Sequence, residues 1–263
     1  MHNLNAVTAN VSYRYDGSLA GFYCCVFDSY ARKEIPAAIS SDEDDNGQIP
    51  LAPERWVLIN PGQALRVRDG LAIKGTLRAR DLLEHVFLSC MERRETALLA
   101  FARTVFAEGS RVLERLADPL VARLLKAEKG LLGEAHLLTG FVRFTQTEAG
   151  LVSIIGPKNF VLPLIAPHFA DRLGGEAFLI YDKTHGAALV HEPGKPWTVA
   201  RMEPPREQPT DDETRVQALW RRFYKTIGIA ERENPVCRRS HMPMRYWPYM
   251  TEMKEFYPGY NGS

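Results

Sequence analysis

The sequence predicts an α+β fold, in which a central helical block precedes a small antiparallel sheet and a basic helical segment. Three observations predict it. Apolar residues recur at helical spacing through residues 80–138. Residues 140–202 contain short runs rich in Val, Ile and aromatic residues, which are typical of strands. Beyond an acidic, Pro-rich stretch, cations and aromatic residues alternate along a further helical pattern, 214–256.

The first predicted element is a helix that begins near residue 19 and ends before Pro36. Its apolar side chains have the spacing of one helical face: Leu19, Phe22, Tyr23, Val26, Phe27 and Tyr30. Asp16 or Ser18 is well placed to cap the first turn. A glycine before a helix lets backbone amides approach an anion, so Gly17 and Ser18 form a candidate phosphate site. An ordinary helix cap is the alternative.

The helical block and the sheet follow. Asp118 and Pro119 have the residue types of an N-cap and a first helical position. After residue 140 the strand-like runs and one helix, near 162–173, give the order β-β-α-β-β-β. Two pairs of these strands are joined by connections too short for a crossover helix. We therefore expect them to form antiparallel hairpins.

Composition divides the chain into a body and a C-terminal segment. We expect an α+β body over residues 1–203 and a linker over 204–213, where Pro and acidic residues are concentrated. The basic helical segment 214–256 is expected to pack on the body, and 257–263 to form a tail.

Overall composition is that of an ordinary folded protein. The 263 residues include 33 Lys and Arg against 32 Asp and Glu, and 45% are hydrophobic. No apolar run is long enough for a membrane span, and the N-terminus lacks the pattern of a secretion signal. The four cysteines have no metal-binding spacing. We expect a cytoplasmic protein with no membrane partner, no metal and no cofactor.

A nucleic-acid interface is predicted in the C-terminal segment. Between Arg215 and Pro248 there are eight Lys and Arg residues but only two acids, a local net charge of +6. Arginine fits phosphate oxygens, and interleaved aromatic rings can stack on unpaired bases. The candidate residues are Arg221, Arg222, Lys225, Arg232, Arg238, Arg239, Arg245, Tyr246 and Trp247. In the alternative, Trp220 and Phe223 are core residues and the cations form an ordinary solvated face.

Catalytic machinery is not visible in the sequence. His241 lies inside the basic segment, and Glu252 and Asp16 are further candidates for general acid or base. Their spacing matches no recognised catalytic motif. This favours a chain that is not catalytic on its own.

Four ordered blocks together carry a family resemblance. They are YDGSLAGFYCCVFDSYARKEIP, GLLGEAHLLTGFVRF, FLIYDKTHGAAL and IGIAERENPVCRRSHMPMRYWPYMTEM. The chain resembles a bacterial family of uncharacterised proteins described as "probable DNA metabolism protein". Matching positions are Tyr15 to Ser18 at the front and Ile229, Arg232, Asn234, Pro235, Met242, Pro243, Tyr246 and Trp247 at the back.

The resemblance implies a context rather than a mechanism. It implies that the chain accompanies a radical S-adenosylmethionine (radical SAM) protein of DNA repair or modification. Some family members are fused to a uracil-DNA glycosylase-like domain, which implies such a domain in trans as a further partner.

Three functions are compatible with these observations. The first is an accessory protein that binds DNA and presents it to the radical SAM partner, with RNA left open as the ligand. The second is an enzyme acting on a modified or damaged base, such as a glycosylase or lyase. The third is an adaptor that binds only the partner protein through an exposed apolar patch, for which the helical block 80–138 is the expected place.

Overall fold

The fold is α+β, as predicted. The computed structural model describes residues 7–41, 52–205, 208–227 and 234–257. The chain forms two compact units, Met1–Gly130 and Leu131–Ser263. This division falls within one helix, whereas the division expected from composition, at the 204–213 linker, lies inside the second unit.

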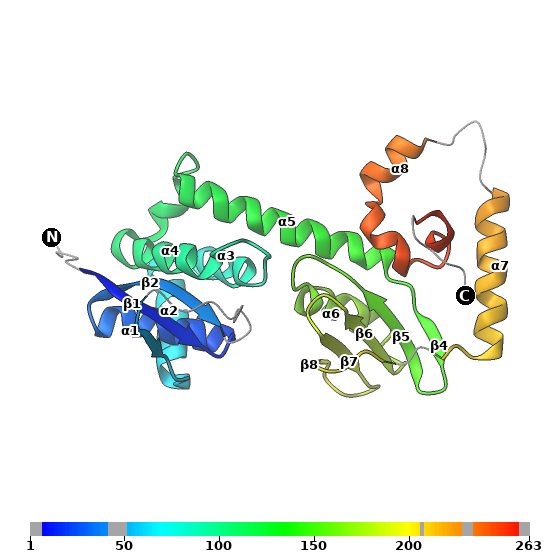
Figure 1. The fold of residues 1–263 in the computed structure, drawn as a ribbon, viewed down its shortest axis with the longest axis horizontal. Coiled ribbons are helices and arrows are strands. Elements are labelled where there is room, and N and C mark those ends of the chain that lie inside the picture. Colours follow the sequence, from blue (N-terminus) through cyan, green and yellow to red (C-terminus); the bar gives the residue numbers. More distant parts are fainter. Residues whose placement is uncertain (1–6, 42–51, 206–207, 228–233, 258–263) are drawn as a thin grey trace. The chain divides into compact units, whose positions relative to one another are not determined.

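The first unit contains a three-stranded parallel sheet. Its strands are β1 (Val7–Tyr15), β2 (Glu34–Ser41) and β3 (Glu54–Trp56), in the order β2-β1-β3 (Figure 1). Helix α1 (Leu19–Ala31) connects β1 to β2. The sequence predicts α1 and its end before Pro36, but not the two strands on either side of it. Pro36 is tolerated because β2 is an edge strand.

The remaining helices of this unit pack with α1 and the sheet around one apolar core. They are α2 (Pro61–Gly75), α3 (Leu77–Phe87), α4 (Arg94–Glu108), a 3-10 helix η2 (Gly109–Glu114) and α5 (Pro119–Phe141). The helical block therefore begins at Pro61, earlier than the predicted residue 80, because Asn60 caps α2 by accepting a hydrogen bond from the Gln63 amide. Asp118 caps α5, as predicted, through the amide of Leu120 at 2.8 Å.

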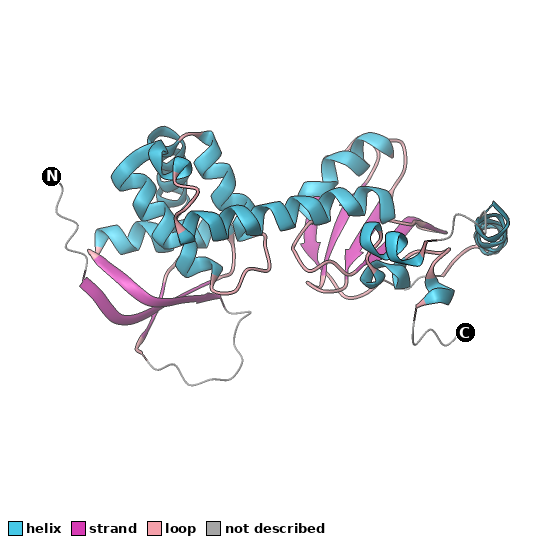
Figure 2. Cartoon of the chain, turned by 90° about the horizontal axis from the view of Figure 1, so that it is seen from above, coloured by secondary structure: helices cyan, strands magenta, loops and turns pink. Residues whose placement is uncertain are grey.

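The second unit contains a five-stranded mixed sheet. Its strands are β4 (Thr145–Thr147), β5 (Gly150–Ile155), β6 (Phe178–Asp182), β7 (Ala187–His191) and β8 (Thr198–Arg201), in that spatial order (Figure 1). Figure 2 shows the strands of both sheets in magenta. Helix α6 (Leu162–Arg172) connects β5 to β6 and packs against β7.

The predicted element order and hairpins are confirmed, but the prediction of an antiparallel sheet is wrong. Strands β5 and β6 pair in parallel, because α6 returns the chain to the end of the sheet at which β5 begins, and β6 then runs in the same direction as β5. The other three pairs are antiparallel. The sheet also begins at Thr145 rather than near residue 140, because α5 continues through Phe141.

The C-terminal segment divides into an exposed and a buried part. Helix α7 (Asp211–Ile227) buries no residue against the parts of the chain that the structure describes. Its apolar face remains open, with Leu219 65% and Phe223 52% exposed, so the alternative in which Trp220 and Phe223 are core residues is wrong. Helix α8 (Pro235–His241) and two 3-10 helices, η4 (Met244–Tyr249) and η5 (Lys254–Phe256), follow.

Candidate nucleic-acid interface

A buried carboxylate, Glu134 on α5, holds the C-terminal segment against the rest of the second unit. It accepts hydrogen bonds from the backbone amides of Lys158 and Asn159 and from the Tyr246 hydroxyl at 2.8 Å, and it pairs with Arg245 at 3.2 Å. Burial alone would raise the pKa of Glu134. The hydrogen bonds from Asn159, Lys158 and Tyr246 outweigh it, so the pKa is lowered and the group stays ionised.

A second buried carboxylate, Glu252, orients Arg143. The Arg143 guanidinium reaches Glu252 through Nη2 at 2.7 Å and Nε at 3.2 Å, and it donates through Nη1 to the Gly140 carbonyl. Trp220 Nε1 also donates to Glu252 at 3.2 Å. Burial acts to raise the pKa of Glu252, but Arg143 reverses the effect and the pKa is lowered. Glu252 is therefore an anchoring anion rather than a proton donor at neutral pH.

Three cations and several hydroxyls line one cavity of the second unit. Its volume is about 300 Å³, and its polar lining residues are Arg143, Lys183, Lys254, Thr145, Thr251 and Tyr249. These residues come from β4 and the connection before it, from the turn between β6 and β7, and from the C-terminal 3-10 helices and the turn between them.

The turn that carries Lys183 is held by a buried aspartate. Asp182 accepts hydrogen bonds from the amides of Thr184 at 2.9 Å and His185 at 3.2 Å, and its other oxygen lies 2.6 Å from His185 Nδ1. Another lining residue, Tyr249, packs closely over Gly156, where a Cβ atom would lie 2.7 Å from the Tyr249 ring carbon Cζ. The cavity is thus built on fixed elements.

The cavity is electrostatically suited to an anion. Lys183 and Lys254 form no ion pair with any residue that the structure describes, and the acid bound to Arg143 is Glu252. Two ammonium groups without an acidic partner among the described residues thus line the same cavity as the Arg143 guanidinium, whose charge Glu252 balances, and hydroxyls of Thr145, Thr251 and Tyr249 can donate hydrogen bonds beside them. A phosphate group would receive charge-assisted hydrogen bonds from several directions.

Comparison with known proteins places the chain in a family. A family model described as a domain of unknown function, DUF4130, matches residues 92–252. The chain belongs to this family. No curated protein and no solved structure matches it. The DUF4130 match includes Arg143 and Lys183, and it ends two residues before Lys254.

Of the cations predicted to bind nucleic acid, those on α7 differ in their partners. Lys225 pairs with Glu255 at 2.5 Å, and Arg221 donates to the Gln217 carbonyl. Arg222 is exposed and forms no ion pair with the described residues. These three cations therefore lie on a solvated helix.

The predicted cations nearer the C-terminus are partly used in packing. The Arg238 guanidinium lies 5.7 Å from the Trp247 ring centroid and 5.6 Å from that of Phe256. Arg239 is exposed and donates to the Pro235 carbonyl. Arg245 binds Glu134 and covers the Tyr246 ring. Arg232 lies outside the described residues.

The structure does not leave Tyr246 and Trp247 available for stacking on bases. Their exposed fractions are 1% and 4%, and both polar atoms are satisfied inside the unit. Tyr246 donates to Glu134, and Trp247 Nε1 donates to the Met242 carbonyl at 2.9 Å. The two rings are therefore part of the apolar core of the second unit.

At the predicted anion site, Gly17 and Ser18, the structure shows the helix cap that was the alternative. Ser18 Oγ accepts a hydrogen bond from the Gly21 amide at 2.9 Å, and Asp16 accepts from both the amide and the hydroxyl of Ser18. Gly17 has a positive φ of 81°, which allows this tight turn. The nearby Asp16 carboxylate makes the position unfavourable for an anion.

The three catalytic candidates are divided between the two units. Asp16 belongs to the first unit. In the second unit, Glu252 is buried, whereas His241 is exposed at the end of α8, 3.0 Å from the Cys237 carbonyl. Neither lines the cationic cavity. Among the described residues there is also no group of three His, Cys, Asp or Glu side chains arranged for a metal ion, and no helix long and apolar enough to cross a membrane.

Proposed function

We propose that this chain is a DNA-binding accessory protein of a radical SAM repair or modification system, which presents nucleic acid to the partner enzyme. The observation that carries the proposal is the cavity lined by Arg143, Lys183 and Lys254. The radical SAM partner rests on the family resemblance of the four sequence blocks.

A backbone phosphate is the ligand that this cavity fits best. Guanidinium and ammonium groups bind phosphate by charge and hydrogen bonding, and they carry no base specificity. The exposed cations Arg222 and Arg239, in the same unit, can add further backbone contacts. An accessory protein needs to bind DNA without sequence preference, since the partner would recognise the altered base.

An accessory function also agrees with the state of the carboxylates. Glu134 and Glu252 are buried and held ionised, so neither can donate a proton at neutral pH, and the oxygens of both already accept hydrogen bonds from within the unit. An enzyme acting on a flipped base would need such a group beside an open pocket. The enzyme alternative therefore receives less support than the accessory function.

The test is DNA binding by fluorescence anisotropy with a labelled oligonucleotide at about 50 mM salt. We expect Lys183→Ala combined with Lys254→Ala to weaken binding by roughly tenfold or more, since two phosphate contacts are lost. The matched control combines Lys158→Ala with Lys195→Ala, which removes the same charge from exposed positions of the same unit. Equal affinities of the two double variants would contradict the proposal. An RNA of the same sequence, run in parallel, identifies the preferred nucleic acid.

A protein-only adaptor is the second candidate, and the exposed face of α7 favours it. Val216, Leu219, Phe223 and Ile227 recur at helical spacing and are all more than half exposed. This patch lies on α7 rather than in the helical block 80–138. Replacing Leu219 and Phe223 by Ser should abolish co-purification of the radical SAM partner from the native host while DNA affinity stays unchanged. Co-purification at the original level would reject the adaptor.

A further inference from the structure

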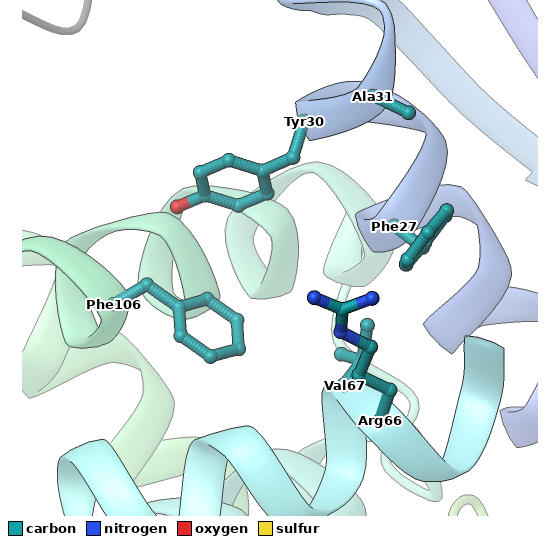
Figure 3. A pocket seen from close by; sticks show the side chains of 6 residues that line it. All are labelled: Phe27, Tyr30, Ala31, Arg66, Val67 and Phe106. Carbon is teal, nitrogen blue, oxygen red and sulfur yellow. The ribbon is translucent and has the colours of Figure 1, made fainter. Parts of the chain in front are cut away.

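The first unit contains a second cavity, which has apolar walls. Its volume is about 430 Å³, and it lies between α1, α2 and α4. The lining residues are Phe27, Tyr30, Ala31, Arg66, Val67 and Phe106 (Figure 3). The volume is in the range of pockets that hold small molecules, roughly 300–1,000 Å³.

The aromatic walls of this cavity are held in place. The rings of Tyr30 and Phe106 are almost perpendicular, with centroids 5.7 Å apart, and together they form a corner. The Arg103 guanidinium lies 4.6 Å from the Tyr30 centroid and is itself bound to Ser29 Oγ. Gly70 lets Phe106 approach α2, because a Cβ atom there would lie 3.0 Å from the Phe106 ring.

Arg66 is the one charged residue in this lining, and it has no acidic partner among the described residues. In Figure 3 its guanidinium points into the space between Phe27, Tyr30 and Phe106. The next arginine on the same helix, Arg68, is instead paired with Asp69 at 2.9 Å. An unpaired guanidinium beside apolar walls is a position where an anionic group would be bound strongly.

The side chains that line this cavity offer few hydrogen-bonding groups that could distinguish one ring system from another. The Tyr30 hydroxyl already donates to the Arg103 carbonyl at 3.4 Å, and the other uncharged lining side chains carry no polar atoms. A ligand would therefore be held by packing of its ring and by its charge. Nucleobases of any identity satisfy the first requirement, and a phosphate attached to the same nucleoside satisfies the second.

We infer that this cavity binds a nucleotide with an unpaired base, whose ring packs on Phe27, Tyr30 and Phe106 while its phosphate binds Arg66. The inference does not rest on the proposed function, since every residue involved belongs to the first unit. Its ligand is a single nucleotide, whereas the cationic cavity requires only backbone phosphate.

Titration calorimetry with the full chain tests the inference, using dAMP, dTMP, deoxyadenosine, inorganic phosphate and benzoate as probes. We expect both nucleotides to bind roughly tenfold or more tightly than deoxyadenosine or phosphate, because the ring and the anion are recognised together. Benzoate carries a planar ring and an anion without a nucleoside. If benzoate binds as tightly as the nucleotides, or if neither nucleotide binds, the inference is wrong.

Variants then locate the site. Arg66→Ala should weaken dAMP binding by roughly tenfold, and dAMP and deoxyadenosine should then bind this variant with nearly equal affinity. Arg66→Lys should restore part of the lost affinity for dAMP. The matched control is Arg111→Ala, which removes an exposed arginine of the same unit outside the cavity. An Arg66→Ala variant with the affinity of the Arg111→Ala control would overturn the inference. Both arginines are exposed, so folding is expected to survive and is checked by circular dichroism.

Discussion

Glu134 is the residue on which the polar contacts of the second unit converge. It lies on α5, yet its hydrogen bonds reach the loop before α6 and the C-terminal 3-10 helix η4. Because the side chain is buried, its partners would be left unsatisfied without it. Among the described residues, Glu134 thus links a helix to two segments distant in sequence.

Replacing Glu134 by Gln should destabilise the second unit by about 2–3 kcal/mol at pH 7, because the amide keeps one acceptor but presents a donor to the surrounding N–H groups. Urea unfolding followed by tryptophan fluorescence measures this, with the buried Trp247 one of the four tryptophans that contribute. The control Glu148→Gln changes an exposed carboxylate in a turn and should leave the unfolding midpoint unaltered. Equal midpoints of the two variants would contradict the assigned role of Glu134.

The lowered pKa of Glu134 also predicts the pH dependence of stability. A carboxyl whose pKa falls on folding contributes stability above its ordinary value of 4.5, and the contribution is lost as the pH falls toward the folded-state value. The free energy of unfolding should therefore decrease below about pH 5. This decrease should be smaller in the Glu134→Gln variant, and an equally steep one would show that other carboxyls dominate.

Gly156 offers a separate test of the cationic cavity. A methyl group at this position would collide with the Tyr249 side chain, so Gly156→Ala should displace that ring and cost about 1–3 kcal/mol. Because Tyr249 lines the cavity, DNA affinity should fall as well. Gly175→Ala is the control, since a Cβ atom there meets no other atom within 4 Å. Unchanged DNA affinity in folded Gly156→Ala would exclude Tyr249 from the binding surface.

Single residues also show where sequence reasoning reaches its limit. Tyr246 and Trp247 lie among cations, and composition alone gives no means of distinguishing a stacking platform from a core residue. The sequence does not distinguish Lys183 and Lys254 from other lysines, because each is an ordinary lysine in its own sequence context. The topology of β6, β7 and the C-terminal segment brings these two lysines together, and no local sequence pattern indicates that they are close in space.

At the scale of elements, α1 depends on its cap. Ser18→Ala removes the hydrogen bond to the Gly21 amide and should destabilise the first unit by about 1 kcal/mol. If the position is only a cap, DNA affinity should stay unchanged in anisotropy measurements. A loss of affinity without a loss of stability would instead restore the anion site predicted at Gly17 and Ser18.

Helix α7 should tolerate polar substitutions on its apolar face. Phe223→Ser is expected to change the free energy of unfolding by less than about 0.5 kcal/mol, because the side chain is half exposed. Trp247→Ala, in the buried part of the same segment, should cost about 3–5 kcal/mol. Chemical unfolding of both variants distinguishes the two environments. A large loss in Phe223→Ser would mean that the α7 face is covered in the isolated protein.

Elements with local signals could be predicted, and elements with long-range pairing could not. Helix α1, the start of α5 and the hairpins follow from apolar spacing, caps and short turns. Strand β1 pairs with a strand beyond α1, with Val7 opposite Glu34, and parallel pairing leaves no turn signal. The α7 pattern reveals an apolar face, but periodicity does not indicate whether anything covers that face.

At the scale of the whole molecule, a net charge of +1 conceals local cationic sites. Glu252 balances the charge of Arg143, so among the described cations of the cavity Lys183 and Lys254 are the two that are free to neutralise phosphates. If each neutralises one phosphate, the logarithm of duplex affinity should fall with the logarithm of salt at a slope of about −1.8, and affinity should drop roughly 12-fold between 50 and 200 mM salt. The variant lacking Lys183 and Lys254 should show a slope shallower by about 1.8, and an unchanged slope would place the phosphate contacts elsewhere.

Helix α5 has a practical consequence for dividing the protein into fragments. Glu128 pairs with Arg78 and His85 in the first unit, while Glu134, less than two turns later, anchors the second. A fragment starting at Leu131 would keep Glu134 but lose the Asp118 cap and the first half of the helix. One ending at Gly130 would stop the helix without a C-cap. Expression of either half alone therefore calls for overlapping boundaries, with all of α5 included in both pieces.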